Sequence, residues 1–135
     1  MISPGQKFEL EFNYSQKEVE AFAALTGDTN PLHINYEYAA ATVFKKPIIH
    51  GFLGSAVFSR ILGTEFPGEG TIYLSQSLSF KRPMYTDVTY KAIVTVTSTD
   101  TTKNTAVLKT IVVDPKSGKV IISGEASVVN KDKIV

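Results

Sequence analysis

Residues 51–63 read GFLGSAVFSRILG, and this stretch decides the fold. Apolar side chains lie around most of the circumference of the helix that it predicts, which is typical of a helix buried at the centre of a domain. Gly54 and Gly63 each cost such a helix about 1 kcal/mol relative to Ala. We therefore expect a strand or a ligand to approach the helix closely at these two glycines.

Strand patterns fill most of the remaining sequence. Four long alternating runs of apolar and polar residues follow the helix, and residues 6–13 alternate in the same way, which is typical of strands. The later runs occupy residues 71–80, 88–96, 106–114 and 120–128. Residues 114–118, DPKSG, predict a hairpin turn between the last two runs, and strands joined by short turns are antiparallel. The expected class is α+β, with an antiparallel sheet of about five strands wrapped around the central helix.

The N-terminal part predicts two more helices. Residues 15–27, SQKEVEAFAALTG, begin with the Ser-x-x-Glu pattern of a capping box and end at a glycine, which is a typical helix stop. The Asn30–Pro31 step then favours an extended or turn conformation. Asn35 is a suitable cap for a short helix over residues 36–44, which the following Lys-Lys-Pro sequence ends.

Length and composition indicate a single domain of an ordinary globular kind. The chain has 135 residues, of which 43% are hydrophobic and 20% charged, and its net charge is +1. Because the basic residues are scattered, we expect no nucleic-acid partner. The chain has no Cys, which excludes thiol nucleophiles and Cys-ligated metals. No signal-peptide layout and no apolar run near 18 residues is present, so we expect no membrane association and a cytoplasmic location.

The loop of residues 26–33, TGDTNPLH, places Asp28 and His33 five positions apart. Three interpretations compete. The two residues form a proton-transfer pair, or Asp28 only satisfies nearby backbone amides in a turn, or both join His50 in a metal site of two imidazoles and one carboxylate. The spacing matches no established metal motif, so we expect no metal.

A second segment, residues 47–55 with the sequence PIIHGFLGS, leads into the central helix. Gly51 opens that helix, so its backbone N–H is an unpaired donor at the positive end of the helix dipole. Such a donor stabilises an enolate oxygen, an effect of about 3 kcal/mol when one oxyanion donor is lost. In the alternative interpretation His50 caps the helix and Gly51 only permits a tight turn.

Together the two segments supply the groups for adding water across an activated C=C bond. That reaction needs a base, an acid and an oxyanion donor, and Asp28, His33 and the Gly51 N–H provide one of each. An ordinary aspartate is a weak base at neutral pH, so we expect an apolar wall beside it. The candidates for this wall are Leu25, Leu32, Ile34 and Phe52.

The run from Phe22 through TGDTNPLHINYEYAAATVFKKPIIHGFL resembles the hydratase signature of the MaoC-like family, the (R)-specific enoyl-CoA hydratases. The resemblance continues in IYLSQSLSFKRPMY and covers nearly the whole chain. The family has Asp two residues after the motif His, where this chain has Asn35. Asn caps a helix as well as Asp does.

The resemblance implies a hot-dog fold over residues 1–135, one domain with the sheet wrapped around residues 51–63, and a homodimer with two sites at or near its interface. It also implies (R)-specific, reversible hydration of a trans-2-enoyl thioester, carried by coenzyme A or acyl carrier protein. Coenzyme A is then part of the substrate, and no separate cofactor is expected. By the same resemblance Asp28 and His33 hold one water, the Gly51 N–H is the oxyanion donor, and Asn30 and Ser59 support them.

Binding residues for the substrate are less specific. Coenzyme A carries phosphates, for which Lys45, Lys46, Lys81 and Arg82 are candidates; the alternative is solvated surface charge. Phe52 is expected to help shape the acyl pocket, and short to medium acyl chains are expected.

Two other functions remain open for the same fold. A hot-dog thioesterase would direct a carboxylate-activated water at the carbonyl carbon, and fold alone does not separate this from hydration. A non-catalytic acyl-thioester-binding subunit is the second. The Asp–Asn-Pro-Leu-His loop favours hydration over hydrolysis, and the joint presence of Asp28, His33 and Gly51 argues against a binding subunit.

Overall fold

The computed structural model describes all residues from Met1 to Val135. The helices are α1 (Gln16–Thr26), α2 (Pro31–Ile34), α3 (Tyr36–Ala40) and α4 (Gly51–Thr64). The strands are β1 (Lys7–Phe12), β2 (Ile72–Gln76), β3 (Ser79–Phe80), β4 (Tyr90–Asp100), β5 (Thr105–Val113) and β6 (Val120–Val129). None of the helices is long and apolar enough to cross a membrane.

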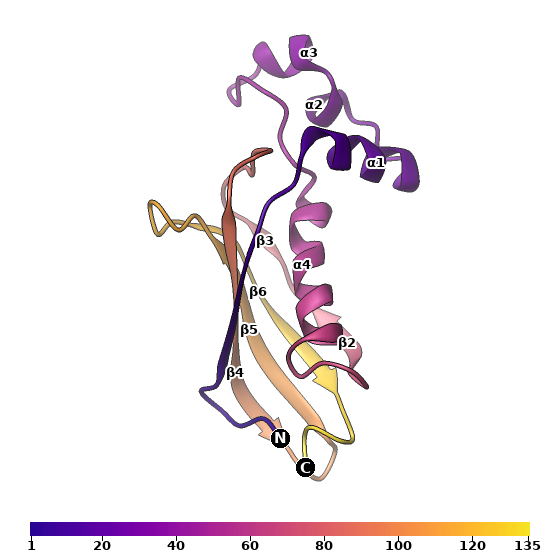
Figure 1. Cartoon of the computed structure of the whole chain (residues 1–135), viewed down its shortest axis with the longest axis vertical. Coiled ribbons are helices and arrows are strands. Elements are labelled where there is room, and N and C mark those ends of the chain that lie inside the picture. Colours follow the sequence, from indigo (N-terminus) through magenta and orange to yellow (C-terminus); the bar gives the residue numbers. More distant parts are fainter.

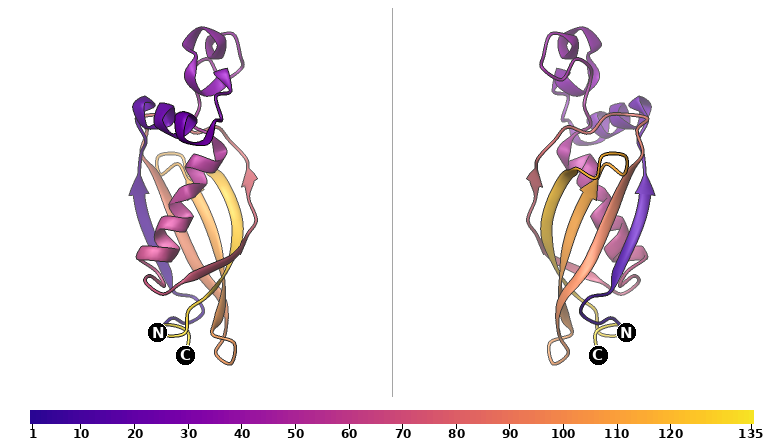
Figure 2. Two further views of the ribbon diagram at one scale, coloured as in Figure 1. Left: turned by 90° about the vertical axis from the view of Figure 1, so that its right-hand side faces the viewer. Right: turned by 90° about the vertical axis from the view of Figure 1, so that its left-hand side faces the viewer.

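One antiparallel sheet curves around α4. The strand order is β1-β4-β5-β6-β2, and β3 also pairs with β6. Figure 1 shows α4 lying along the concave side of the sheet, with α1, α2 and α3 gathered beyond its N-terminal end and both chain termini at the opposite end. Figure 2 shows β1 at one edge of the sheet and β2 at the other. The expected hot-dog arrangement is confirmed, but the sheet has six strands and not about five.

The extra strand arises because the run expected over residues 71–80 is interrupted. At the interruption the chain passes very close to Gly124 of β6: a Cβ atom there would overlap the Ser77 carbonyl oxygen. The Ser77 N–H donates to the Glu125 carbonyl at 2.9 Å, and its hydroxyl accepts from the Glu125 N–H at 3.0 Å. β2 and β3 therefore follow β6 as two short pieces of one edge.

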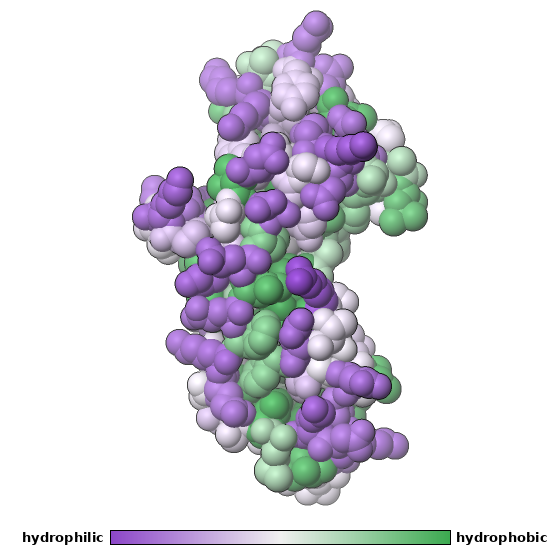
Figure 3. Space-filling model, viewed as in Figure 1, coloured by the Kyte–Doolittle hydropathy of each residue, from purple (hydrophilic) through white to green (hydrophobic).

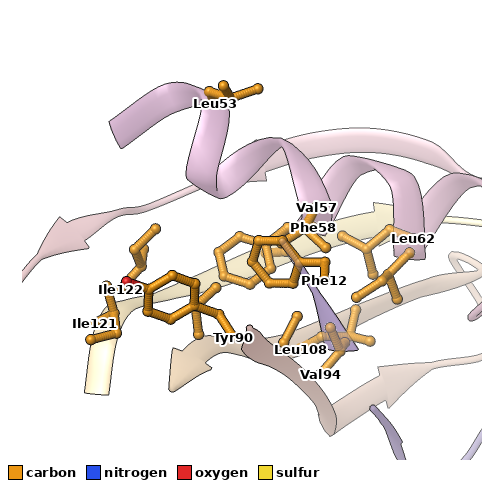
Figure 4. Close-up of a cluster of buried hydrophobic side chains, with 14 of the residues drawn as sticks. Phe12, Leu53, Val57, Phe58, Leu62, Tyr90, Val94, Leu108, Ile121 and Ile122 are labelled. Carbon is orange, nitrogen blue, oxygen red and sulfur yellow. The ribbon is translucent and has the colours of Figure 1, made fainter. Parts of the chain in front are cut away.

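The core lies between α4 and the sheet. Alternate residues of the three central strands point toward the helix and are buried. In Figure 4, Val57, Phe58 and Leu62 of α4 lie above Leu108 and Tyr90 from the strands. Phe58 is completely buried. Leu108 faces Val96 on one neighbouring strand and Ala126 on the other, so the register brings small and large side chains together beneath the helix.

The two glycines of α4 differ from each other. A Cβ atom at Gly54 would lie 2.5 Å from the Met84 sulfur, so the expected close approach is confirmed there. At Gly63 nothing lies within 4 Å, so that expectation is wrong. Gly63 is exposed near the end of the helix, where the sheet no longer contacts this face.

The N-terminal helices follow the expected caps. Ser15 and Glu18 form both hydrogen bonds of the capping box, and Gly27 ends α1 in the left-handed conformation. As expected, α1 does not continue through the Asn30–Pro31 step, where Asn30 has φ −51° and ψ 123°. The one-turn helix α2 over residues 31–34 was not predicted. Proline suits the first position of a helix, where its fixed φ angle fits and no N–H is needed. α3 ends at Ala40 and is shorter than expected.

The surface mixes hydrophilic and hydrophobic residues. Figure 3 shows hydrophilic residues over the whole of one face, with hydrophobic residues appearing between them. Several large apolar side chains are exposed, including Leu25, Val43, Phe52, Ile72 and Leu74.

Replacing Gly124 by Ala should destabilise the fold by about 1–3 kcal/mol, the range for a group forced into a packed site. The reason is that the added methyl group displaces the Ser77 carbonyl and separates β2 and β3 from β6. The free energy of unfolding from urea titration, at one protein concentration, measures the effect.

Gly63→Ala is the matched control. It should stabilise the protein by up to about 1 kcal/mol, because Ala is the better helix former and no atom lies in its way. Equal effects of the two substitutions would contradict the close crossing at Gly124.

Candidate active site

The segment between α1 and α4 carries both predicted site loops. α1 ends at Gly27, whose N–H donates to the Ala23 carbonyl at 2.9 Å, and Asp28 follows directly. The Asn30 side chain caps α2 by accepting from the Leu32 N–H at 3.0 Å, and its carbonyl accepts from the His33 N–H at 3.0 Å. Asn30 therefore starts the helical turn that carries His33.

Two hydrogen bonds to other segments hold His33, and a third holds the residue before it. Its Nδ1 lies 2.8 Å from the Ile48 carbonyl oxygen, and because a carbonyl only accepts, Nδ1 carries the proton and donates. In the neutral ring Nε2 is then a free acceptor. The Gln16 side-chain amide donates to the His33 carbonyl at 2.8 Å, and the Ile48 N–H donates to the Leu32 carbonyl at 3.3 Å.

The environment of His33 favours the neutral ring. Burial lowers the pKa of His33 below its ordinary value of 6.5, and the neighbouring His50 lowers it further. The Ile48 carbonyl and the Asp28 carboxylate act in the opposite direction, but the net pKa shift is downward. At neutral pH, Nε2 of His33 is therefore available to accept a proton or a hydrogen bond.

His50 is buried directly beside His33. Only 1% of its surface is exposed, and its Nε2–H donates to the Asp28 carbonyl at 3.0 Å. The two imidazole rings stack, with 3.9 Å between centroids and 29° between planes. The interpretation of His50 as a side-chain cap of α4 is wrong, because it makes no capping hydrogen bond although it occupies the N-cap position. Its ring is engaged with Asp28 and His33 instead.

A carboxylate oxygen of Asp28 and one ring nitrogen from each imidazole lie within 4.8 Å of one another. The loop thus brings Asp28 and His33 together, as predicted. One nitrogen of each imidazole is already engaged with a backbone carbonyl, Nδ1 of His33 with that of Ile48 and Nε2 of His50 with that of Asp28.

Gly51 opens α4 beside this pair. None of the N–H groups of Gly51, Phe52 and Leu53 donates to an acceptor of the protein, because His50 does not cap the helix. Gly51 and His33 line one pocket of about 410 Å³. A Cβ atom at Gly51 would lie 2.7 Å from the Phe80 ring, so glycine keeps the wall of this pocket open. The pocket therefore combines a proton acceptor with unpaired backbone donors.

The predicted basic residues fall into two groups. Lys81 and Arg82 line the pocket, and Arg82 also donates to the Val120 carbonyl at 2.6 Å. Lys45 and Lys46 are exposed and do not line it. The Lys46 ammonium lies 4.8 Å from the centre of the Tyr85 ring, a cation–π contact that ties this segment to the neighbouring loop.

Ser59 lies apart from the other predicted residues. It is exposed on α4, two turns after Gly51, and lines a second pocket of about 340 Å³ between α4 and β2. The structure of the single chain does not bring it to His33. Phe52 is 72% exposed and lines both pockets, so it separates them as a shared wall.

The apolar wall expected beside Asp28 is not formed within one chain. Asp28 is exposed, and the side chain of Leu25 is 85% exposed. Leu32 and Ile34 are half-buried, and Phe52 points into solvent and the two pockets. The expectation fails because Asp28 lies in the loop after α1, where no other segment of the chain covers it.

The sequence did not identify the apolar walls of the pocket. Phe44, Ile48, Phe80, Met84 and Ile122 contribute them from four separate segments. Alternation marked Phe80 and Ile122 as strand residues, but only the tertiary structure shows that both line the pocket that holds Gly51. From the sequence, His50 was considered only as a metal ligand or as a helix cap. Its position next to the glycine that opens the helix was the one feature that could have indicated its burial.

Comparisons with known proteins give the same picture. An (R)-specific enoyl-CoA hydratase of Aeromonas caviae is 44% identical over 94% of this chain and 94% of its own length. That of Rhodospirillum rubrum is 43% identical over 94% of this chain and 87% of its own. The solved structure of the (R)-hydratase from A. caviae involved in PHA biosynthesis superposes with a TM-score of 0.91, at 43% identity, over 96% of this chain and 97% of that one.

A more distant relative is named for a different thioester carrier. A mitochondrial 3-hydroxyacyl-[acyl-carrier-protein] dehydratase of Arabidopsis thaliana is 34% identical over 86% of this chain and 70% of its own length. Residues 2–116 match the family described as MaoC like domain. With that match over most of its length, and with relatives of this similarity, the chain belongs to the MaoC-like family.

Proposed function

We propose that the protein hydrates trans-2-enoyl-CoA to (3R)-hydroxyacyl-CoA, reversibly, as a lyase. The observation that carries this proposal is that the Asp28 carboxylate lies beside the His33 ring, and that His33 lines one pocket with Gly51, whose N–H is unpaired. The names of the relatives that match along most of the chain support the choice of substrate and the (R) product.

The water in this mechanism lies between Asp28 and His33. Both groups are hydrogen-bond acceptors, so they orient its two O–H bonds and leave an oxygen lone pair directed at C3 of the enoyl group. As the C–O bond forms, Asp28 accepts a proton, and the electron pair moves onto the thioester oxygen. The Gly51 N–H stabilises the enolate at that oxygen.

The proton that reaches C2 comes from the water. His33 Nε2 carries no proton in the neutral ring, and its Nδ1–H is engaged with the Ile48 carbonyl. Asp28 takes this proton from the water. Asp28 and His33 together then transfer it to C2. The water adds as OH on C3 and H on C2, and no other reactant is consumed.

Lys81 and Arg82 are proposed to face the phosphates of the carrier, since they line the pocket that holds Gly51. Lys45 and Lys46 have less support, because they lie outside it. The carrier is coenzyme A or acyl carrier protein, and the acyl chain is short to medium.

We also propose that the protein is a homodimer. β2 and β3 pair only with β6, so their second edge is free. This edge is apolar, with Ile72 63% and Leu74 55% exposed, and an exposed apolar edge strand favours pairing with another chain. A second copy covering β2 would also enclose the second pocket, which holds Ser59.

The first test mixes the protein with crotonyl-CoA and follows loss of the enoyl chromophore together with release of free thiol. The double bond should be consumed without thiol. Asp28→Asn should be at least about 100-fold slower, as expected for a lost general base. Glu37→Gln, which alters an exposed carboxylate of the same segment, is the control and should keep full activity. Thiol release would indicate a thioesterase, and no signal would indicate a binding subunit.

The pH dependence of kcat/KM tests the protonation state of His33. Because the pKa of His33 is lowered from 6.5, kcat/KM should not decline between about pH 8 and pH 6.5 through this residue and should decline below that. The sign follows from the mechanism: protonation of Nε2 removes the acceptor that holds the water. An acid limb centred above 6.5 would contradict a neutral His33.

Sedimentation velocity tests the dimer. The unchanged protein should sediment as a dimer, and Ile72→Lys should shift it toward monomer, because a charge placed on the edge strand disfavours pairing. Val43→Lys alters a side chain that is 85% exposed outside this edge and should leave the dimer intact. A monomeric unchanged protein would rule the dimer out.

A further inference from the structure

His50 is the second of only two imidazoles in the chain, and the proposed mechanism gives it no chemical step. It is nevertheless one of the few polar side chains in the interior. A buried imidazole that neither caps its helix nor contacts the pocket calls for a physical reason, because burying a polar group without partners is costly.

The hydrogen bond of His50 acts on Asp28. Its Nε2–H donates to the Asp28 backbone carbonyl at 3.0 Å, across 22 residues of sequence. Asp28 itself lies on an exposed loop. The only other hydrogen bond at its backbone is the one that its N–H donates to the Thr26 hydroxyl at 3.2 Å. His50 is therefore the link that joins the Asp28 backbone to the start of α4.

The ring of His50 acts on His33. One side of it stacks on the His33 ring at 3.9 Å, and Phe22 of α1 lies against it at 4.8 Å and 57°. The Ile48 carbonyl therefore holds the edge of the His33 ring, and His50 holds its face. Displacement of His50 would release both the ring plane of His33 and the backbone of Asp28.

We propose that His50 is a positioning residue for the water-activating pair, holding Asp28 by its Nε2–H and His33 by its ring. This proposal rests on the proposed hydratase function, because that function makes Asp28 and His33 the pair that activates water. It goes beyond that function by assigning a role to a residue that touches neither water nor thioester.

The second ring nitrogen of His50 is also part of this arrangement. With Nε2 donating to the Asp28 carbonyl, Nδ1 is buried and has no hydrogen-bond partner. The titratable groups that face His33 are His50 and Asp28, and Lys81 and Arg82 line the same pocket. Since His50 lowers the pKa of His33, its removal should raise that pKa.

Two substitutions separate the two contacts. His50→Phe keeps a ring for the stack and removes the N–H donor, whereas His50→Gln keeps an N–H donor and removes the ring. With crotonyl-CoA, His50→Phe should lower kcat by roughly 100-fold, the cost of a misplacement near 1 Å, with little change in KM. His50→Gln should lower kcat by roughly 10-fold. In both, the acid limb of the pH profile should move to higher pH.

Val96→Ala controls for loss of stability alone. Val96 is a buried residue of β4 that exchanges backbone hydrogen bonds with Gly5 and Gln6, at the end of the sheet opposite α1, α2 and α3 (Figure 1). Its truncation should therefore lower the unfolding temperature and leave the acid limb unchanged. Imidazole ¹⁵N NMR gives a readout that does not need activity. In the unchanged protein it should show a neutral His33 with its proton on Nδ1, and a proton on Nε2 of His50. In both variants the pKa of His33 should rise.

Folded variants with kcat within threefold of the unchanged protein and an unchanged His33 titration would overturn the proposal. If one variant does not fold, the other decides by the same two readouts. If the unchanged protein lacks hydratase activity, the proposed function fails. The NMR titration then decides whether His50 positions His33.

Discussion

The burial of α4 against the concave side of the sheet is the constraint on which the rest of the structure depends. Phe58 and Ile61 are completely enclosed, and removing such side chains from water is the main favourable term in folding. A helix fixed in this way has only one place for its N-terminus, at the end of the sheet where α1, α2 and α3 gather (Figure 1). The segment that precedes the helix must therefore return to this point.

That return assembles the site from contacts between distant segments. The bonds from Gln16 to the His33 carbonyl, from His33 to the Ile48 carbonyl and from His50 to the Asp28 carbonyl each join two different segments. All three use a backbone carbonyl as acceptor, so neither imidazole is held by an ion pair. Since His50 turns toward Asp28 and does not cap α4, the first N–H groups of the helix stay unpaired and face a ligand-sized pocket. The same residue thus shapes both halves of the site.

Much of the fold follows from local patterns. The helix over residues 51–63 was predicted from its apolar circumference, the end of α1 from its glycine, and the last hairpin from DPKSG, where the Gly118 N–H donates to the Asp114 carbonyl at 2.7 Å. In the site, Asp28, His33 and Gly51 were identified from the types and spacing of residues in two short segments. These features depend on neighbouring residues, and neighbouring residues carry the necessary physical information: periodicity, capping and turn chemistry.

The remaining features depend on which distant residues meet, and only the tertiary structure decided them. The split of the edge strand follows from the crossing of Ser77 over Gly124, and the separation of Ser59 from His33 follows from the direction of α4. The choice of Lys81 and Arg82 over Lys45 and Lys46 follows from the strand register. The sequence by itself determined the elements and the reactive groups, because these are set by local chemistry. The curvature of the sheet around α4 decided which groups share one pocket. It also decided that His50 lies buried between Phe22 and His33, because the packing of the whole chain sets the distances between these rings.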